Sequence, residues 1–190
     1  MSKFFAFLTR MKYILRWSLM RNTRGENIAE HSYYTATIAH VLAVIRRDVF
    51  GIECDPGQVA VCAMYHDVGE ILTGDMPTPI KYMNPEIRDV YKKIEQNASK
   101  RLTADLPQGV KQAVADAMEP EDEQIVKLVK AADKLSAYLK CIEEENAGNS
   151  EFTRAQAQTL EALKQMHMDE VDYFLEKFVP ACRLTLDELE

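Results

Sequence analysis

The segment AMYHDVGEILTGDMPTP, residues 63–79, places an imidazole beside a carboxylate in a stretch that has the apolar pattern of a buried helix. His66 and Asp67 are adjacent, and Glu70 follows three residues later. Charged groups inside a protein core cost free energy unless they are paired or bind a metal ion. Partners that offset this cost are therefore expected elsewhere in the chain.

A second carboxylate, that of Asp133, lies within or beside an apolar helical stripe. The stripe consists of Ile125, Leu128, Val129, Ala132, Ser136 and Leu139, and its spacing is that of a core-facing helix side. The partner of Asp133 is then a basic side chain, a helix N-terminus or a metal ion. Taken alone, His31, His66, Asp67 and Asp133 each have an ordinary interpretation as a buried histidine, cap or ion pair. Their combination on three predicted helices is a much more specific indication of a metal site than any one of them alone.

Helical periodicity extends over nearly the whole chain, without the period-two alternation typical of strands. The predicted helices cover residues 28–49, 56–72, 85–106 and 108–118, a long stretch from the acidic EPEDE segment to about residue 145, and residues 151–166 and 169–178. Asn27 and Glu30 have the spacing of a capping box, and both Asp55–Pro56 and Asn84–Pro85 have the order of a cap followed by proline.

The remaining segments are assigned from shorter patterns. Phe4, Leu8, Met11 and Leu15 form one more helical stripe, and residues 74–85 are expected to form a proline-bearing loop. The sequence thus predicts an all-α protein, folded as a single domain over residues 1–190 with no linker.

Composition excludes several classes of protein. The net charge is −7, and residues 1–25 hold six basic side chains and no acidic one, which leaves 17 basic against 30 acidic residues in the remainder. An acidic protein is a poor nucleic-acid binder, whereas a local basic segment can bind a small anion such as phosphate. An organellar transit peptide is the alternative for this segment. It is disfavoured because Trp17 and the residues after it run on into His31.

Location is predicted from hydropathy and cysteine usage. No apolar stretch approaches the roughly 20 residues that span a membrane. The four cysteines, at positions 54, 62, 141 and 182, are scattered and form no CxxC motif, which is typical of reduced thiols. A cytoplasmic protein without a membrane partner is expected.

Four longer stretches carry a family resemblance. The chain resembles the HD-domain metal-dependent phosphohydrolases, which are all-helical, and within them the bacterial 5′-deoxynucleotidases. The resemblance covers nearly the whole chain, and it is carried by RWSLMRNTRGENIAEHS, AMYHDVGEILTGDMPTPIKY, AADKLSAYLKCIEE and VDYFLEKFVP.

The resemblance implies that His31, His66, Asp67 and Asp133 bind one divalent metal ion. Two imidazoles and two carboxylates suit Co²⁺, Mn²⁺ or Zn²⁺, and the ligand types do not decide among them. His31 and Asp133 are also expected to contact the substrate.

A mononuclear site is expected because binuclear members of the superfamily use additional histidines. Only His40 and His167 remain in this chain. His40 follows His31 by nine residues, which places it about half a turn around the helix and roughly 13 Å along it. His167 lies outside any matching motif.

The same resemblance makes Glu70 the catalytic proton shuttle, with Asp67 also contributing to catalysis. On a continuous helix, Glu70 shares a face with His66 and Asp67. The ordinary alternative is an exposed glutamate at a helix end.

Substrate contacts are implied by two further motifs. Arg16 and Trp17 match the RW pair of the family, in which the arginine binds phosphate and the tryptophan helps to exclude a ribose 2′-hydroxyl. Asp75, Pro77 and Thr78 match GDxPTP, and Asp75 is placed to bind the sugar 3′-hydroxyl. Core packing for Trp17 and capping for Asp75 are the alternatives. Weaker candidates are Glu119 for the site and Lys81 and Arg21 for phosphate.

The predicted function is metal-dependent hydrolysis of deoxyribonucleoside 5′-monophosphates to deoxynucleoside and phosphate, by a homodimer. One alternative is another HD phosphohydrolase, either a deoxynucleoside triphosphohydrolase or a cyclic-nucleotide phosphodiesterase. The other is a non-catalytic, metal-stabilised nucleotide-binding protein.

Overall fold

The computed structural model describes residues 1–81 and 83–190, without the side chains of residues 78 and 79. The helices are α1 (Phe4–Leu8), α2 (Ile28–Val44), α3 (Pro56–Tyr65), α4 (Glu70–Thr73), α5 (Thr78–Lys81), α6 (Pro85–Thr103), α7 (Gln108–Met118), α8 (Glu123–Asn146), α9 (Thr153–Lys164) and α10 (Asp169–Lys177). Single turns of 3₁₀ helix occupy Met11–Tyr13, Ser150–Phe152, Val179–Arg183 and Leu186–Glu188, and a π turn occupies Ile45–Val49. Over the described ranges no strand forms, so the all-α prediction is confirmed.

The helix starts follow the predicted caps. The side chain of Asn27 accepts hydrogen bonds from the backbone of Ala29 and Glu30, and Glu30 completes the capping box. Asp55 and Asn84 cap α3 and α6 in the same way, each followed by proline. These caps satisfy backbone N–H groups that have no partner within the helix.

The predicted continuous helix over residues 56–72 is wrong. α3 ends at Tyr65, and residues 66–69 form turns before α4 begins at Glu70. The break has a local cause, because the ring Nδ1 of His66 binds the carbonyl of Ala63 at 2.7 Å and three-residue hydrogen bonds tighten the chain, such as Glu70 N–H to Asp67 O at 3.0 Å. His66 and Asp67 therefore lie on a turn rather than on a helix.

The N-terminal stripe and the loop over residues 74–85 also need correction. Phe4 and Met11 are buried, but Leu15 is 60% exposed because the chain leaves its helical path there and forms an isolated antiparallel bridge with Asn27. The predicted loop contains the one-turn helix α5.

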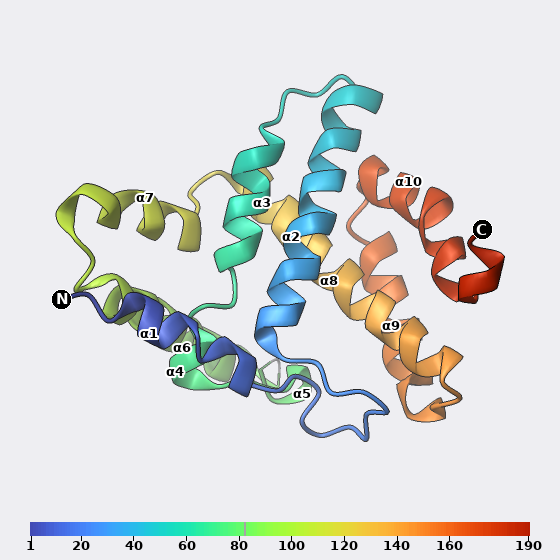
Figure 1. Cartoon of the computed structure of the whole chain (residues 1–190), viewed down its shortest axis with the longest axis horizontal. Helices are drawn as coiled ribbons and strands as arrows, with labels where there is room; N and C mark the ends of the chain where they lie inside the picture. The colour runs from blue at the N-terminus through green and yellow to red at the C-terminus, as the bar shows by residue number, and fades with distance from the viewer. Residues whose placement is uncertain (82) are drawn as a thin grey trace.

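The helices pack around two apolar clusters. The larger one is built mainly from α2, α3, α8 and α10, and the smaller one joins α1, α6 and α7 through residues such as Phe4, Leu102 and Met118. α2 and α3 lie side by side and α8 crosses behind them, while α9 and α10 lie on the opposite side of the molecule from α7 (Figure 1). Ile28 and Val68 belong to the smaller cluster, so the boundary between the clusters passes the start of α2 and the turn after α3.

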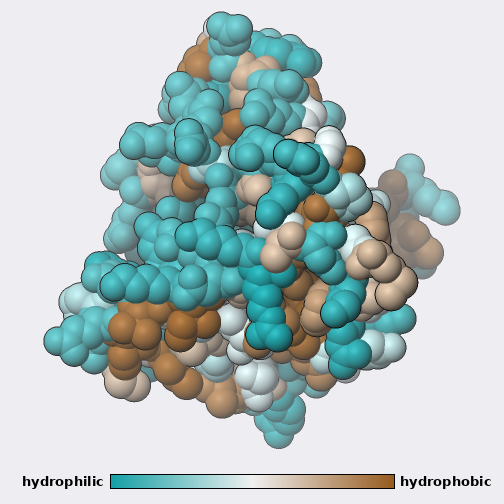
Figure 2. Space-filling model, turned by 90° about the vertical axis from the view of Figure 1, so that its left-hand side faces the viewer, coloured by the Kyte–Doolittle hydropathy of each residue, from teal (hydrophilic) through white to brown (hydrophobic). Residues whose placement is uncertain are grey.

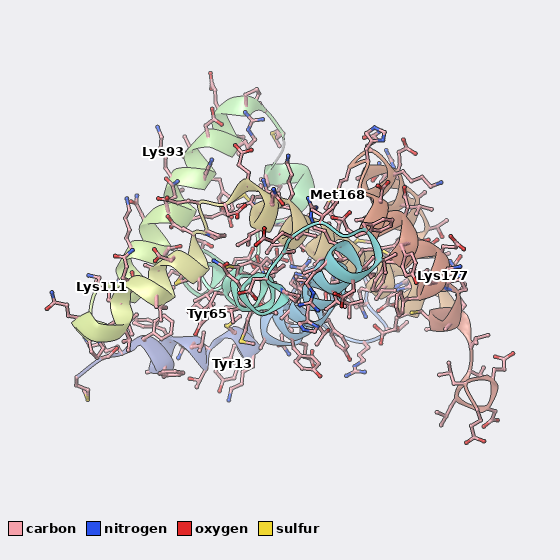
Figure 3. The ribbon with its side chains drawn as sticks, turned by 90° about the horizontal axis from the view of Figure 1, so that it is seen from above. Tyr13, Tyr65, Lys93, Lys111, Met168 and Lys177 are labelled. Atoms are coloured by element: carbon pink, nitrogen blue, oxygen red, sulfur yellow. The ribbon has the colours of Figure 1, made fainter. Side chains whose placement is uncertain are left out.

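The surface shows two further features. Seen from the α7 side it is largely hydrophilic, with apolar side chains gathered along its lower part (Figure 2). The segment after α10 projects away from the helical body (Figure 3). No helix in the described ranges has both the length and the apolar character needed to cross a membrane.

Candidate metal centre and active site

Three elements bring metal-ligating side chains together at the cluster boundary. His31 lies in the first turn of α2, His66 directly follows α3, and Asp133 lies midway along α8. One ligand atom from each lies within 4.8 Å of the others. Three of the four predicted ligands, up to about 100 positions apart in sequence, thus present donors to one point, while Asp67 is not a member of this group.

The two imidazoles are fixed with the same nitrogen turned inward. Nδ1 of His66 lies 2.7 Å from the carbonyl oxygen of Ala63, which can only accept, so this nitrogen carries the proton. Nδ1 of His31 lies 3.2 Å from the hydroxyl of Ser136. In both rings Nε2 is left to act as a ligand, and such outer partners commonly orient metal-binding histidines.

The residues present fit a divalent metal ion. Nε2 of His66 is buried and has no hydrogen-bond partner, although Oδ2 of Asp67 lies 3.1 Å away. Nε2 of His31 lies 3.1 Å from Oδ1 of Asp133 and 3.5 Å from Oδ2 of Asp67. Among these ligand atoms, Nε2 of His66 is the one left buried and unsatisfied, and buried polar atoms are rarely left in this state.

Arg16 links the carboxylates on the open side of the centre. Its guanidinium places Nη1 3.3 Å from Oδ2 of Asp67 and Nη2 3.8 Å from Oδ1 of Asp133, while Nε lies 3.2 Å from Glu26. The side chain is only 13% exposed. The predicted phosphate-binding arginine therefore lies directly beside two of the predicted metal ligands, Asp67 and Asp133.

The cations around the centre keep the two aspartates ionised. Burial raises the pKa of Asp133, but the hydrogen bond and charge of His31 and the charge of Arg16 outweigh it and hold that pKa well below its usual range. Burial likewise raises the pKa of Asp67, and the charges of His66, His31 and Arg16 bring it down to about 2. Ionised carboxylates are the form that binds metal.

Glu70 has the opposite electrostatic environment. The residue is 7% exposed, and its Oε2 has no hydrogen-bond partner. Burial and the negative charges of Asp67 and Asp75 raise its pKa to about 9. A protonated carboxyl group beside a metal centre is suited to proton transfer. Glu70 is thus buried, and the alternative of an exposed helix-end glutamate is excluded.

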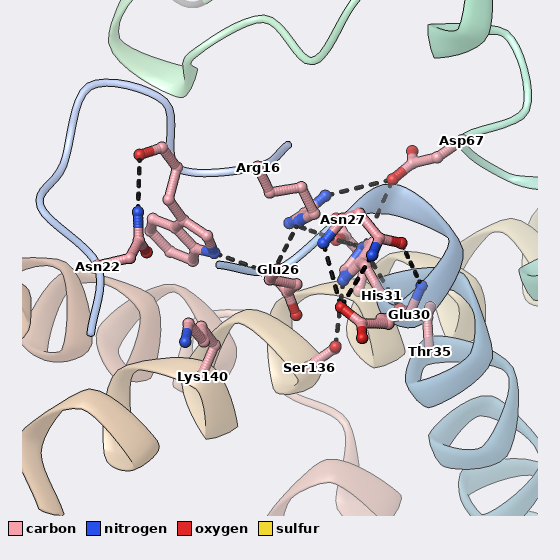
Figure 4. Close-up of polar contacts among 12 residues, drawn as sticks. Arg16, Asn22, Glu26, Asn27, Glu30, His31, Thr35, Asp67, Ser136 and Lys140 are labelled. Carbon is pink, nitrogen blue, oxygen red and sulfur yellow. Dashed lines mark hydrogen bonds and ion pairs between the residues drawn. The ribbon is translucent and has the colours of Figure 1, made fainter. Parts of the chain in front are cut away.

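Trp17 adopts a conformation that is rare for a bulky residue. Its φ is 59°, in the left-handed region that costs free energy for a side chain with a Cβ. Its indole Nε1 donates to Glu26 at 3.0 Å, and its ring lies 5.2 Å from that of Phe152 between centroids. These contacts hold Trp17 next to Arg16 and Glu26, two residues whose polar contacts are drawn in Figure 4.

A cavity of about 850 Å³ opens beside the centre. Arg16, Trp17, Asp75, Pro77 and Asp133 line one part of it. The rest of the lining comes from α8, the 3₁₀ turn Ser150–Phe152 and α9, and it includes Lys134, Ala137, Glu151, Arg154, Gln158 and Thr159. Five predicted site residues therefore face one cavity.

The other predicted residues separate into three groups. The side chain of Thr78 lies outside the described residues. Lys81 is paired with Glu95 at 2.8 Å, and the 86% exposed side chain of Arg21 lies 3.6 Å from Glu151. Glu119 is exposed at the end of α7. His40 and His167 are exposed and lie outside the metal-binding group.

Two residues of the site were missed by the sequence analysis. Ser136 follows Asp133 by three residues on α8, a spacing that places both on one helix face and was available as a signal. Glu26 lies ten residues after Arg16, and no local pattern pairs residues across such a loop.

Comparisons with known proteins identify the family of this chain. The model of the family described as 5′-deoxynucleotidase YfbR-like matches residues 3–182. A 5′-deoxynucleotidase of Vibrio cholerae is 48% identical over 193 residues, covering 99% of this chain and 98% of the relative.

Solved structures show the same fold. An HD-domain phosphohydrolase from Listeria innocua matches with a TM-score of 0.82 and 23% identity, covering 95% of this chain and 88% of the other. A cyanophage S-2L HD phosphohydrolase bound to dA and one catalytic Zn²⁺ ion matches with a TM-score of 0.69 and 23% identity, covering 95% and 96%. The predicted resemblance is confirmed, and the chain belongs to the YfbR-like 5′-deoxynucleotidase family.

Proposed function

We propose that the chain hydrolyses deoxyribonucleoside 5′-monophosphates to deoxynucleoside and phosphate with the aid of one divalent metal ion. The observation that carries this proposal is the convergence of His31, His66 and Asp133 beside Arg16, at the mouth of a cavity that Trp17 also lines. Membership of the 5′-deoxynucleotidase family supports the substrate class.

His31, His66 and Asp133 hold the metal ion in this proposal, and Asp67 completes the set. A divalent ion in such a site supplies Lewis-acid polarisation of the phosphoryl group and lowers the pKa of water. Asp67 and Asp133, once engaged as ligands, release the terminal nitrogens of Arg16. The planar fork of Arg16 then pairs with phosphoryl oxygens and neutralises their charge.

Glu70 moves the proton. Its raised pKa keeps a proton on the buried carboxyl group near neutral pH, which suits donation to the 5′-oxygen that leaves as the phosphoester bond breaks. Its backbone is held to Asp67 by the 3.0 Å hydrogen bond from Glu70 N–H to Asp67 O, so the acid stays at a constant position relative to the centre.

Trp17 and Asp75 bind the sugar in this proposal. Trp17 is fixed at its backbone and its indole, so it resists displacement by a 2′-hydroxyl group. Asp75 lines the same part of the cavity, and its carboxylate accepts the 3′-hydroxyl. The wall of α9 accommodates the base. We expect broad base specificity because the sequence has no motif dedicated to reading a base edge. A homodimer, a cytoplasmic location and the absence of a nucleic-acid partner remain predictions.

The test is phosphate release from dAMP, AMP and dATP by chelator-treated protein restored with Co²⁺, Mn²⁺ or Zn²⁺. We expect metal-dependent release from dAMP well above that from AMP or dATP. Release mainly from dATP would instead make the chain a triphosphohydrolase. If no metal restores activity on any substrate, including a cyclic nucleotide, the non-catalytic binding protein becomes the better interpretation.

A variant of Trp17 tests the proposed selectivity for deoxyribose over ribose. Trp17→Ala removes the ring that faces the 2′ position, so the ratio of dAMP to AMP turnover is expected to fall. An unchanged ratio in a folded, metal-loaded Trp17→Ala protein would show that the deoxy preference has another source.

A further inference from the structure

Glu26 closes the loop that carries Arg16 and Trp17. The backbone N–H of Arg16 donates to the carbonyl of Glu26 at 2.9 Å, next to the bridge between Leu15 and Asn27. Glu26 is 9% exposed, although a glutamate is rarely buried without a partner. A buried carboxylate at the closing point of this loop requires an explanation.

One oxygen of Glu26 holds both substrate-facing side chains. Oε2 accepts from Nε of Arg16 at 3.2 Å and from the indole Nε1 of Trp17 at 3.0 Å (Figure 4). Glu26 thus fixes the guanidinium and the indole relative to each other, and it does so from outside the cavity, whose lining does not include it.

The choice of donor atoms matters for function. Because Nε of Arg16 is engaged by Glu26, its Nη1 and Nη2 are turned toward Asp67 and Asp133. The indole of Trp17 is held through its only polar atom, so its ring cannot rotate away without losing a charge-assisted hydrogen bond. Without Glu26, Arg16 would keep its contacts with the aspartates and Trp17 its packing on Phe152, but no shared acceptor would link the two side chains.

We propose that Glu26 is a positioning residue that couples the phosphate-binding Arg16 to the sugar-facing Trp17, and so sets the selectivity for deoxyribonucleotides. The inference rests on the proposed function for the roles of Arg16 and Trp17. Glu26 does not touch the substrate, and its effect is transmitted through the two side chains that it holds.

The central variant is E26Q, which keeps the volume of the side chain and removes its charge. We expect the KM for dAMP to rise roughly tenfold, the effect of weakening one charged hydrogen bond. The ratio of dAMP to AMP turnover should fall roughly threefold or more, since discrimination against a hydroxyl depends on a rigid wall. The melting temperature should change little.

The matched control is E30Q. Glu30 lies one helical turn further along and is exposed, and it contacts Asn27 rather than Arg16 or Trp17. Glutamine also serves in a capping box, so E30Q should leave the KM and the turnover ratio unchanged. An equal change in both variants would assign the effect to charge alone and overturn the proposal.

Fluorescence gives a readout that does not depend on activity. Trp17 is the only tryptophan of the chain, so the emission reports on its indole alone. In E26A the emission maximum should shift to the red, and acrylamide should quench the emission more strongly because the indole is more exposed. E30Q should match the wild type in both measurements. Emission of a folded E26A identical to that of the wild type would overturn the proposal.

The kinetic and fluorescence experiments distinguish a failure of this inference from a failure of the proposed function. If the wild-type protein releases no phosphate from dAMP, the proposed function fails, and the fluorescence of E26A still decides whether Glu26 holds Trp17. If E26A does not fold, E26Q decides, because a wild-type KM and turnover ratio in E26Q contradict the coupling.

Discussion

Glu70 and Glu144 are the same residue type, and both are buried, but their surroundings are opposite. The carboxylate of Glu144 is fully buried and accepts from Nζ of Lys140 at 2.7 Å, from the backbone and hydroxyl of Thr23 at 2.9 and 2.7 Å, and from Asn149 at 2.8 Å. Oε2 of Glu70 has no partner.

The two pKa values diverge accordingly. Burial raises the pKa of Glu144, but the hydrogen bonds from Lys140, Asn149 and Thr23 outweigh it and lower that pKa to about 2. Burial and neighbouring carboxylates raise the pKa of Glu70 to about 9. Glu144 is an anion with all of these hydrogen bonds made, and it connects the loop before α2 to α8. Glu70 is a protonated acid whose Oε2 has no hydrogen-bond partner, and we assign it to proton transfer. Satisfaction of hydrogen bonds, rather than burial, distinguishes the two roles.

The largest expected effect is on turnover in Glu70→Ala. Loss of the proton-transfer group should lower kcat by about 10²–10⁴-fold, while metal content stays at the wild-type level. The melting temperature should not fall, because no hydrogen bond to Oε2 is lost. Glu176→Ala, at a glutamate whose side chain is 70% exposed, serves as the control and should keep wild-type kcat. A Glu70→Ala protein with wild-type turnover would remove Glu70 from the mechanism.

The counterpart is Glu144→Ala, which should lower stability instead. The variant leaves Lys140 with only the half-exposed Glu143 as a counter-charge, and it leaves the donors of Thr23 and Asn149 without their acceptor. Removing one partner of a buried ion pair in this way is expected to lower the free energy of unfolding by about 3–5 kcal/mol. Urea denaturation measures it.

The matched control for that variant is Glu143→Ala. Glu143 pairs with the same Lys140 at 3.0 Å, but its side chain is 47% exposed, so the expected loss is at most about 1 kcal/mol. Equal losses in the two variants would show that burial of Glu144 contributes nothing.

A smaller effect is expected from Ser136→Ala, which removes the partner of Nδ1 of His31. Loss of such an orienting contact should weaken metal binding by about 10–100-fold, as measured by chelator competition. Ser32→Ala is the control, since Ser32 is a buried serine next to His31 whose hydroxyl has no partner. Equal metal affinity in both variants would mean that Ser136 does not orient the ring.

The smallest effect is the pH dependence of stability that Glu144 contributes. Its folded pKa of about 2 lies below the ordinary value of 4.5, so the stabilisation is complete above about pH 4.5 and is lost as pH falls toward 2. The gap in melting temperature between the wild type and Glu144→Gln should narrow over that window. If the difference in melting temperature stayed constant from pH 6 to pH 3, the lowered pKa of Glu144 in the folded protein would be contradicted.

The sequence by itself determined the features that depend on neighbouring residues. Periodicity gave the all-α class, and the side chains of Asn27, Asp55 and Asn84 marked helix starts, because caps act within three residues of the backbone that they bind. The metal-binding residue types and their resemblance to a known family were also readable from the sequence.

Only the tertiary structure decided the rest. It showed that His66 and Asp67 lie on a turn, where the Ala63 carbonyl accepts both the ring Nδ1 and the backbone N–H of His66. It also gave Glu70 and Glu144 opposite pKa shifts and joined Glu26 to Arg16 and Trp17. Burial and distant partners produce these properties, and neither is encoded in the spacing of adjacent residues.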